Sequence, residues 1–133
     1  MHFDNVRLLV HDFAASFHFW HEIMGLPLIF RDAGGETYAY FEAGGARLEL
    51  LSAGYFAQSL GQDAPAPASM RGAVVFKVDD GDAKFAALVA RGAAPLAEPK
   101  DRSEWFCRSA HLAAPDGYVV EIFKSLGGFP GNA

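Results

Sequence analysis

The chain of 133 residues is long enough for one domain, or for two small modules that share a core. Its composition, 51% hydrophobic and 20% charged, is ordinary for a globular protein, and its 12 phenylalanines could build a core or an apolar pocket. The formal net charge of −5 argues against nucleic-acid binding, because no basic stripe is present to displace counterions.

Three further features concern the compartment. No apolar run has the length needed to cross a bilayer, and the N-terminus lacks the basic-then-apolar order of a signal peptide. A single cysteine, Cys107, cannot form an internal disulfide. We therefore expect a cytoplasmic protein with no membrane partner.

The first half of the chain begins with a predicted strand at residues 5–10, followed by a segment of helical period at 11–25. Asp12 is suited to cap this helix and Gly25 to end it. The large apolar residues of the segment would share one face: Phe13, Phe17, Trp20 and Met24. Three strand-like runs follow, separated by Gly-Gly pairs that suit tight hairpins: 26–32, 36–43 and 46–52.

Residues 52–71 show no clear period and carry Ala-Pro alternation, so we interpret them as a linker or a mobile flap. A strand at 72–80 and a helix at 81–92 come next. Three more strands are then predicted: 95–100, 107–114 and 118–125. The order β-α-β-β-β therefore occurs twice.

The repeat is also visible in the residues themselves. Residues 6–17 align with 74–85, and residues 43–51 with 115–123, a register that places Glu49 on Glu121. We predict an α+β fold of two pseudo-symmetric βαβββ modules, whose strands form a curved mixed sheet around a shared cleft with the helices outside. The single domain would comprise three segments: module one at 1–51, the linker or flap at 52–71, and module two at 72–126.

Two βαβββ modules, with VRLLVHDFAASFHFWHEIMGLPL in the first and APDGYVVEIF closing the second, resemble the glyoxalase/bleomycin resistance protein/dioxygenase proteins, the vicinal oxygen chelate superfamily. The resemblance covers nearly the whole chain. It implies the fold but not one function, because the superfamily includes lyases, epimerases, dioxygenases, thiol transferases and drug-sequestering proteins.

In metal-dependent members of this superfamily, the resemblance implies an ion held by one residue from the first strand and one from the last strand of each module. These positions correspond to Asn5, Glu49, Ala73 and Glu121. The two glutamates match, whereas Asn5 and Ala73 stand where a histidine would be expected. The remaining donors suit at most a loosely bound hard ion such as Mg²⁺ or Mn²⁺, so we expect no tightly bound cofactor.

Strand alternation assigns further side chains to the face of the two glutamates. Three of them are basic: Arg7, Arg47 and Lys77. Three would supply aromatic walls: Tyr38, Tyr40 and Phe123. His111 lies in the strand before the Pro-Asp-Gly turn and would join them if its side chain points the same way.

The two glutamates could have either of two roles. If Glu49 and Glu121 lie close together without a metal, mutual repulsion would raise one pKa and make that carboxyl a proton shuttle, so both are candidate catalytic residues. Alternatively, each forms an ion pair with Arg7, Arg47 or Lys77 and catalyses nothing.

Two functions of the cleft stay open at this point, and a third possibility is that the cleft is vestigial and a dimer surface is the working part. One is a small-molecule-binding protein of the glyoxalase/bleomycin resistance type, which holds an organic ligand in the cleft without a tight metal. The other is a divalent-metal-dependent, glyoxalase-like lyase or isomerase that acts on a carbonyl or thiohemiacetal, with Glu49 and Glu121 as ligands. We also expect a homodimer, because such modules leave sheet edges that a partner can cover.

Overall fold

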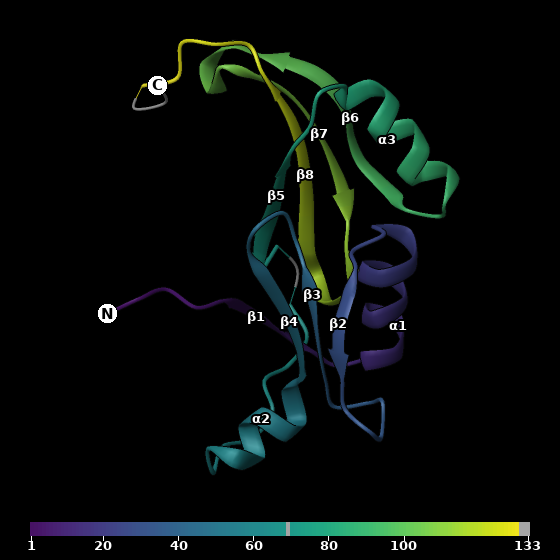
Figure 1. The fold of residues 1–133 in the computed structure, drawn as a ribbon, viewed down its shortest axis with the longest axis vertical. Coiled ribbons are helices and arrows are strands. Elements are labelled where there is room, and N and C mark those ends of the chain that lie inside the picture. The colour runs from purple at the N-terminus through teal and green to yellow at the C-terminus, as the bar shows by residue number, and fades with distance from the viewer. Residues whose placement is uncertain (69, 131–133) are drawn as a thin grey trace. The chain divides into compact units, whose positions relative to one another are not determined.

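The computed structural model describes residues 1–68 and 70–130 (Figure 1). It divides into two compact units, Met1–Ala68 and Ser69–Ala133, which are described separately below. No helix among the described residues is long and apolar enough to span a membrane.

Unit 1 contains a four-stranded mixed sheet in the order β1-β4-β3-β2. Its elements run in this order: β1 (Val6–Val10), α1 (Phe13–His18), the π-helical turn η1 (Phe19–Ile23), β2 (Leu28–Arg31), β3 (Tyr38–Glu42), β4 (Arg47–Ser52) and α2 (Ala53–Ser59). β1 pairs parallel with β4, and the other pairs are antiparallel. The crossover from β1 through α1 brings the helix onto one face of this sheet.

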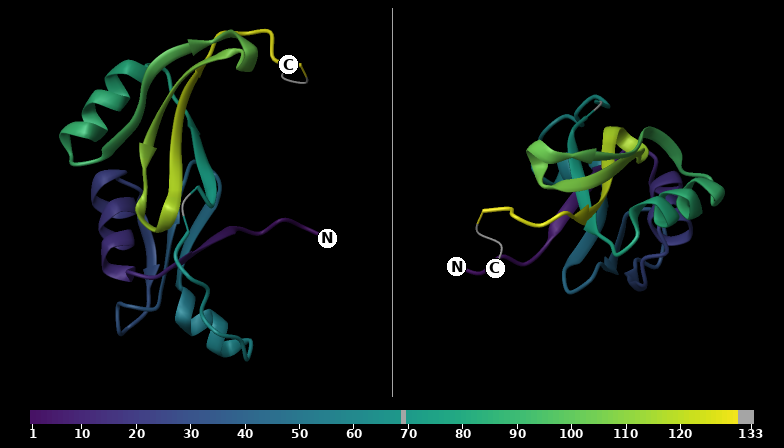
Figure 2. Two further views of the ribbon diagram at one scale, coloured as in Figure 1. Left: turned by 180° about the vertical axis from the view of Figure 1, so that it is seen from behind. Right: turned by 90° about the horizontal axis from the view of Figure 1, so that it is seen from above.

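Unit 2 repeats the arrangement, with strand order β5-β8-β7-β6 and with β5 parallel to β8. Its elements are β5 (Gly72–Lys77), α3 (Gly81–Ala90), β6 (Ala94–Arg102), the 3₁₀ turn η2 (Ser103–Trp105), β7 (Cys107–Ala113), the turn η3 (Pro115–Gly117) and β8 (Tyr118–Ser125). α3 packs beside the strands of its own sheet (Figure 2). The two predicted βαβββ modules are therefore confirmed.

The first helix of each unit begins in the same way. The Asp12 side chain accepts a hydrogen bond from the Ala15 amide at 3.0 Å, and the Asp80 side chain accepts one from the Ala83 amide at 3.0 Å. Each aspartate satisfies an amide that the helix leaves without a partner. The cap predicted at Asp12 is confirmed.

The helical segment of unit 1 changes its pitch part-way along. Phe13 and Trp20 are buried, as the helical period predicts. The π-helical turn that follows α1 has more residues per turn, so Phe19 and Ile23 are buried too, while Met24 is only half-buried. The predicted apolar stripe therefore holds at Phe13 and Trp20, and it omitted Phe19 and Ile23.

The segment predicted as a linker or flap begins with a helix that the sequence analysis missed. α2 follows β4 directly, and the Ser52 hydroxyl accepts a hydrogen bond from the Tyr55 amide at 3.3 Å to cap it. Only two small residues of α2, Ala53 and Ala57, are buried. Because they give almost no hydrophobic period, the helix has no strong signal in the sequence.

The sheet of unit 1 has a helix-facing side and a glutamate-bearing side. Phe41 on β3 contacts Phe17 of α1, with ring centroids 5.7 Å apart, and its cross-strand partner Leu48 is buried as well. Since side chains alternate along a strand, Glu49 lies on the opposite side of the sheet from Leu48 and Leu50. The candidate site is built on this opposite side.

Candidate functional site

In unit 1 the site is centred on Glu49, whose side chain is fully buried. Arg7 Nε donates to Glu49 Oε1 at 2.8 Å, and the Tyr38 hydroxyl donates to Oε2 at 2.8 Å. Arg47 Nε lies 3.1 Å from Oε2, close enough for an ion pair but without hydrogen-bond geometry. Arg7 on β1 and Tyr40 on β3 lie directly opposite Glu49 in the strand register. Because side chains alternate along each strand, this register places the arginines and the tyrosines on the face of Glu49, as predicted.

These contacts neutralise the buried carboxylate. Moving an unpaired carboxylate out of water costs several kcal/mol, and the two guanidinium groups and the phenol offset that cost. Burial, and after it the hydrogen bond to Glu49, raises the pKa of Tyr38 to about 12. Tyr38 therefore stays a hydrogen-bond donor to Glu49 over the whole physiological range.

Arg47 is shared between several partners. Its Nη2 lies 2.9 Å from Asp4 Oδ2, and its guanidinium stacks over the Tyr40 ring at 4.6 Å. The side-chain amide of Asn5 donates to Asp4. Glu49 is thus bound by the arginines and by Tyr38, while Asn5 makes its hydrogen bond to a different carboxylate.

A pocket of about 560 Å³ lies beside this cluster in unit 1. Its lining combines predicted site residues with others that sequence reasoning missed: Arg7, Asp32, Thr37, Tyr38, Leu51, Tyr55, Phe56 and Ser59. The last three belong to α2 or its end. The segment predicted as a flap therefore forms part of this pocket's wall.

In unit 2 the corresponding glutamate has a different environment. Glu121 Oε1 lies 2.8 Å from His111 Nε2, and the His111 ring contacts the Trp105 indole edge-on at 6.2 Å. The Glu121 side chain keeps 21% of its surface exposed, whereas that of Glu49 keeps 1%. The two repeated glutamates are therefore not equivalent in environment.

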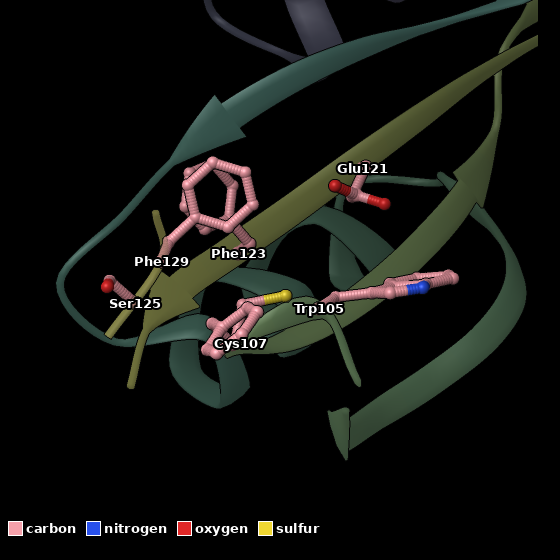
Figure 3. Close-up of a pocket in the computed structure, with 7 residues that line it drawn as sticks. Trp105, Cys107, Glu121, Phe123, Ser125 and Phe129 are labelled. Atoms are coloured by element: carbon pink, nitrogen blue, oxygen red, sulfur yellow. The ribbon is translucent and has the colours of Figure 1, made fainter. Parts of the chain in front are cut away.

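A pocket of about 330 Å³ opens beside Glu121 (Figure 3). Four aromatic residues and three smaller or polar ones line it: Trp105, Phe106, Phe123, Phe129, Cys107, Glu121 and Ser125. Figure 3 shows the Glu121 carboxylate, the Cys107 sulfur and the Trp105 indole gathered with the phenyl rings of Phe123 and Phe129. Of these seven residues, sequence reasoning named only Glu121 and Phe123 as site residues.

The missed residues gave little or no signal in the sequence. Trp105 and Phe106 stand out as a loop-to-strand pair for which packing is the default interpretation, yet they are 47% and 36% exposed at the pocket. Phe129 follows the repeat and has no counterpart in the first module. Cys107 is buried, and burial, then the negative charge of Glu121, raises the pKa of its thiol. A raised pKa disfavours a thiolate nucleophile.

The predicted face-mates on β5 are placed as strand alternation requires. Val75 is the cross-strand partner of Glu121, and Lys77 is that of Phe123. Lys77 is exposed, and in the described part of the chain no ion pair joins it to a carboxylate. Ala73 lies opposite Val119.

His111 joins the site because of a one-residue difference between the modules. The alignment of the repeat places His111 on Ala39, which is buried on the helix side of its sheet. The strand register instead pairs His111 with Glu121, as it pairs Tyr40 with Glu49. The chain from His111 to Glu121 is one residue longer than the chain from Tyr40 to Glu49, and a one-residue shift moves every side chain to the other face.

Comparison with known proteins identifies the family. A sequence model of the Glyoxalase/Bleomycin resistance protein/Dioxygenase superfamily matches residues 2–122. The chain belongs to this superfamily. This chain is 36% identical over 124 residues to YraH of Bacillus subtilis strain 168. The aligned region covers 91% of this chain and 96% of the relative.

Solved structures agree with this assignment. A glyoxalase/bleomycin resistance protein/dioxygenase from Nocardioides is 29% identical, with a TM-score of 0.78 and coverage of 100% of this chain and 89% of the other. A lactoylglutathione lyase from Agrobacterium tumefaciens has a TM-score of 0.67, with 92% of each chain covered. At 17% identity, the lyase shows that the fold is shared and no more.

The superfamily implies a metal, and the donors present in this chain do not fit one. Of the four implied ligand positions, Ala73 has no donor atom and Asn5 is hydrogen-bonded to Asp4. Glu49 has both oxygens bound by Arg7 and Tyr38. Among the described residues, no group of three or more His, Cys, Asp or Glu side chains is placed to hold an ion.

Proposed function

We propose that this chain is a small-molecule-binding protein of the glyoxalase/bleomycin resistance type, which holds an organic ligand without a tightly bound metal. The observation that best supports this proposal is that the Glu49 carboxylate is already occupied by side chains of the protein. Its carboxylate is one of only two at the four implied ligand positions, and Arg7, Arg47 and Tyr38 already surround it.

The electrostatics of that cluster oppose a divalent cation. Two unit charges 4 Å apart interact by about 4 kcal/mol at an effective dielectric constant near 20, so a doubly charged ion would be repelled about twice as strongly by each guanidinium. The ion would also have to displace Arg7 from Oε1. Organic ligands need no such displacement, because the glutamate-bearing sides already have pockets of about 560 and 330 Å³.

Thermal unfolding tests the proposal. EDTA-treated protein is unfolded with Mg²⁺, Mn²⁺, Co²⁺, Ni²⁺ or Zn²⁺, and separately with a panel of small organic molecules. A ligand at a hundred times its Kd stabilises by about 2.7 kcal/mol, a shift of several degrees in a chain of this size. We expect shifts with organic molecules and none with the ions. A metal-dependent shift that disappears in the Glu49→Gln/Glu121→Gln variant would contradict the proposal.

The second candidate is a metal-assisted lyase or isomerase, and the pair of His111 and Glu121 favours it. A carboxylate oxygen 2.8 Å from an imidazole nitrogen is a common acid–base arrangement, and both groups are also metal-ligand types. Glu121→Gln separates the two functions, because it would abolish turnover in an enzyme and only change affinity in a binding protein.

A further inference from the structure

We infer that the pocket beside Glu121 takes a flat organic cation, such as an aromatic ring bearing a protonated amine. This inference rests on the proposed binding function and specifies the chemical class of its ligand. It follows from two properties of the pocket, its charge and its walls.

The charge of the pocket comes from Glu121. Neither lysine nor arginine is among its lining residues. Oε1 of Glu121 faces His111, and within the described residues Oε2 has no hydrogen-bond partner. Arg102, which is not a lining residue, stacks on the Trp105 ring at 4.7 Å and donates to Ser109 at 2.9 Å. The carboxylate therefore offers one free acceptor to a cationic donor.

The walls are aromatic and their positions are fixed. The Phe106 and Phe129 rings meet edge-on at 5.7 Å. Phe106 has a left-handed backbone (φ 58°), a conformation that is strained for an L-residue. A hydrogen bond of 2.9 Å from the Leu126 amide to the Phe106 carbonyl holds this conformation. Aromatic faces carry partial negative charge, so these walls and the carboxylate attract a cation together.

The first module provides an internal contrast. Its glutamate is buried and neutralised by Arg7 and Arg47, and Arg7 also lines the neighbouring pocket. An organic cation would meet a positive charge there. The unit 1 pocket also has a carboxylate, Asp32, and aromatic residues in its lining, but it includes the cation of Arg7, whereas the described lining of the Glu121 pocket includes no lysine or arginine.

Three compounds with one ring system test the inference. These probes are 1-naphthylmethylamine, a cation at pH 7, neutral 1-naphthylmethanol, and anionic 1-naphthoate. Binding is followed by the indole N–H signals in ¹⁵N-correlated NMR spectra of the full chain. Trp105 is 47% exposed at the pocket and reports binding there, while Trp20, fully buried in unit 1, is the internal control.

We expect the amine to bind about tenfold more tightly than the alcohol, with shifts at Trp105 and not at Trp20. Glu121→Gln should remove this preference. The control variant is Glu98→Gln, which changes an exposed carboxylate on β6 and should keep the preference. Equal binding of amine and alcohol, or tighter binding of naphthoate, would overturn the inference while leaving a binding function intact. Failure of all three to shift Trp105 would also overturn it, and the thermal screen then decides the proposed function independently.

Discussion

Replacement of Arg7 by methionine tests whether the ion pair with Glu49 stabilises the fold. Breaking a buried pair on one side costs about 3–5 kcal/mol, because the other charge stays in the protein interior. Arg7 is itself 42% exposed, and Arg47 remains 3.1 Å from the carboxylate, so solvent and the second cation reduce the penalty. We therefore expect Arg7→Met to destabilise the protein by about 2 kcal/mol, or to lower Tm by about 6 °C.

The measurement is urea unfolding followed by fluorescence of Trp20, which lies in the same unit. Arg108→Met is a matched control, since Arg108 is 35% exposed and also forms ion pairs with two carboxylates. Those carboxylates, Asp82 and Asp101, are more than half exposed, so solvent screens the pairs and the control should lose less stability than Arg7→Met.

A rescue variant completes the test. Glu49→Gln in the Arg7→Met background removes the uncompensated charge, while the amide oxygen still accepts the hydrogen bond from Tyr38. It should recover at least half of the lost stability. If Arg7→Met costs no more than Arg108→Met, or if the rescue variant is worse than the single variant, the burial of Glu49 does not depend on Arg7 and the reasoning is refuted.

Three other predictions follow from the structure. The folded-state pKa of Tyr38 is about 12 and its ordinary value is 10.0, so the stability that Tyr38 contributes is complete below pH 10 and is lost as the pH rises through 12. Tyr38→Phe should therefore remove the last step of an absorbance titration of the tyrosines. An unchanged titration would contradict this prediction. Alkylation of Cys107 should reach its half-maximal rate at a higher pH than for a free cysteine, and Glu121→Gln should lower that pH without restoring the ordinary value, because burial is the larger cause. Asp80→Ala should cost about 1 kcal/mol in urea unfolding, and Asp80→Asn much less, because the asparagine oxygen still accepts from the Ala83 amide; equal losses would argue against the cap.

The sequence predicted the sheet and helix order well because hydrophobic period and the internal repeat agree. Every predicted strand and both module helices are present, since apolar alternation and helical period are strong local signals. α2 was missed because its two buried residues are alanines. The π-helical turn after α1 was missed because an extra residue per turn changes the phase of the apolar face without changing its composition.

The candidate site could be predicted only in part. Strand alternation alone placed Arg7 and Arg47 beside Glu49, because that rule depends on nothing but parity. The pairing of His111 with Glu121 depends on the length of one turn, which the aligned repeat misplaces by one residue. Phe106 enters its pocket through a left-handed backbone conformation that no side-chain pattern signals.

The parallel pairing of β1 with β4 also determines when each half of the chain can fold during synthesis. Arg7 and Glu49 are 42 residues apart, so the first strand of unit 1 leaves the ribosome long before its neighbour exists. β1 must stay unpaired until β4 emerges, and β5 must wait in the same way for β8. Translation would therefore complete the first sheet while the second is still being made, and a pause in synthesis between β3 and β4 would expose an apolar strand to aggregation.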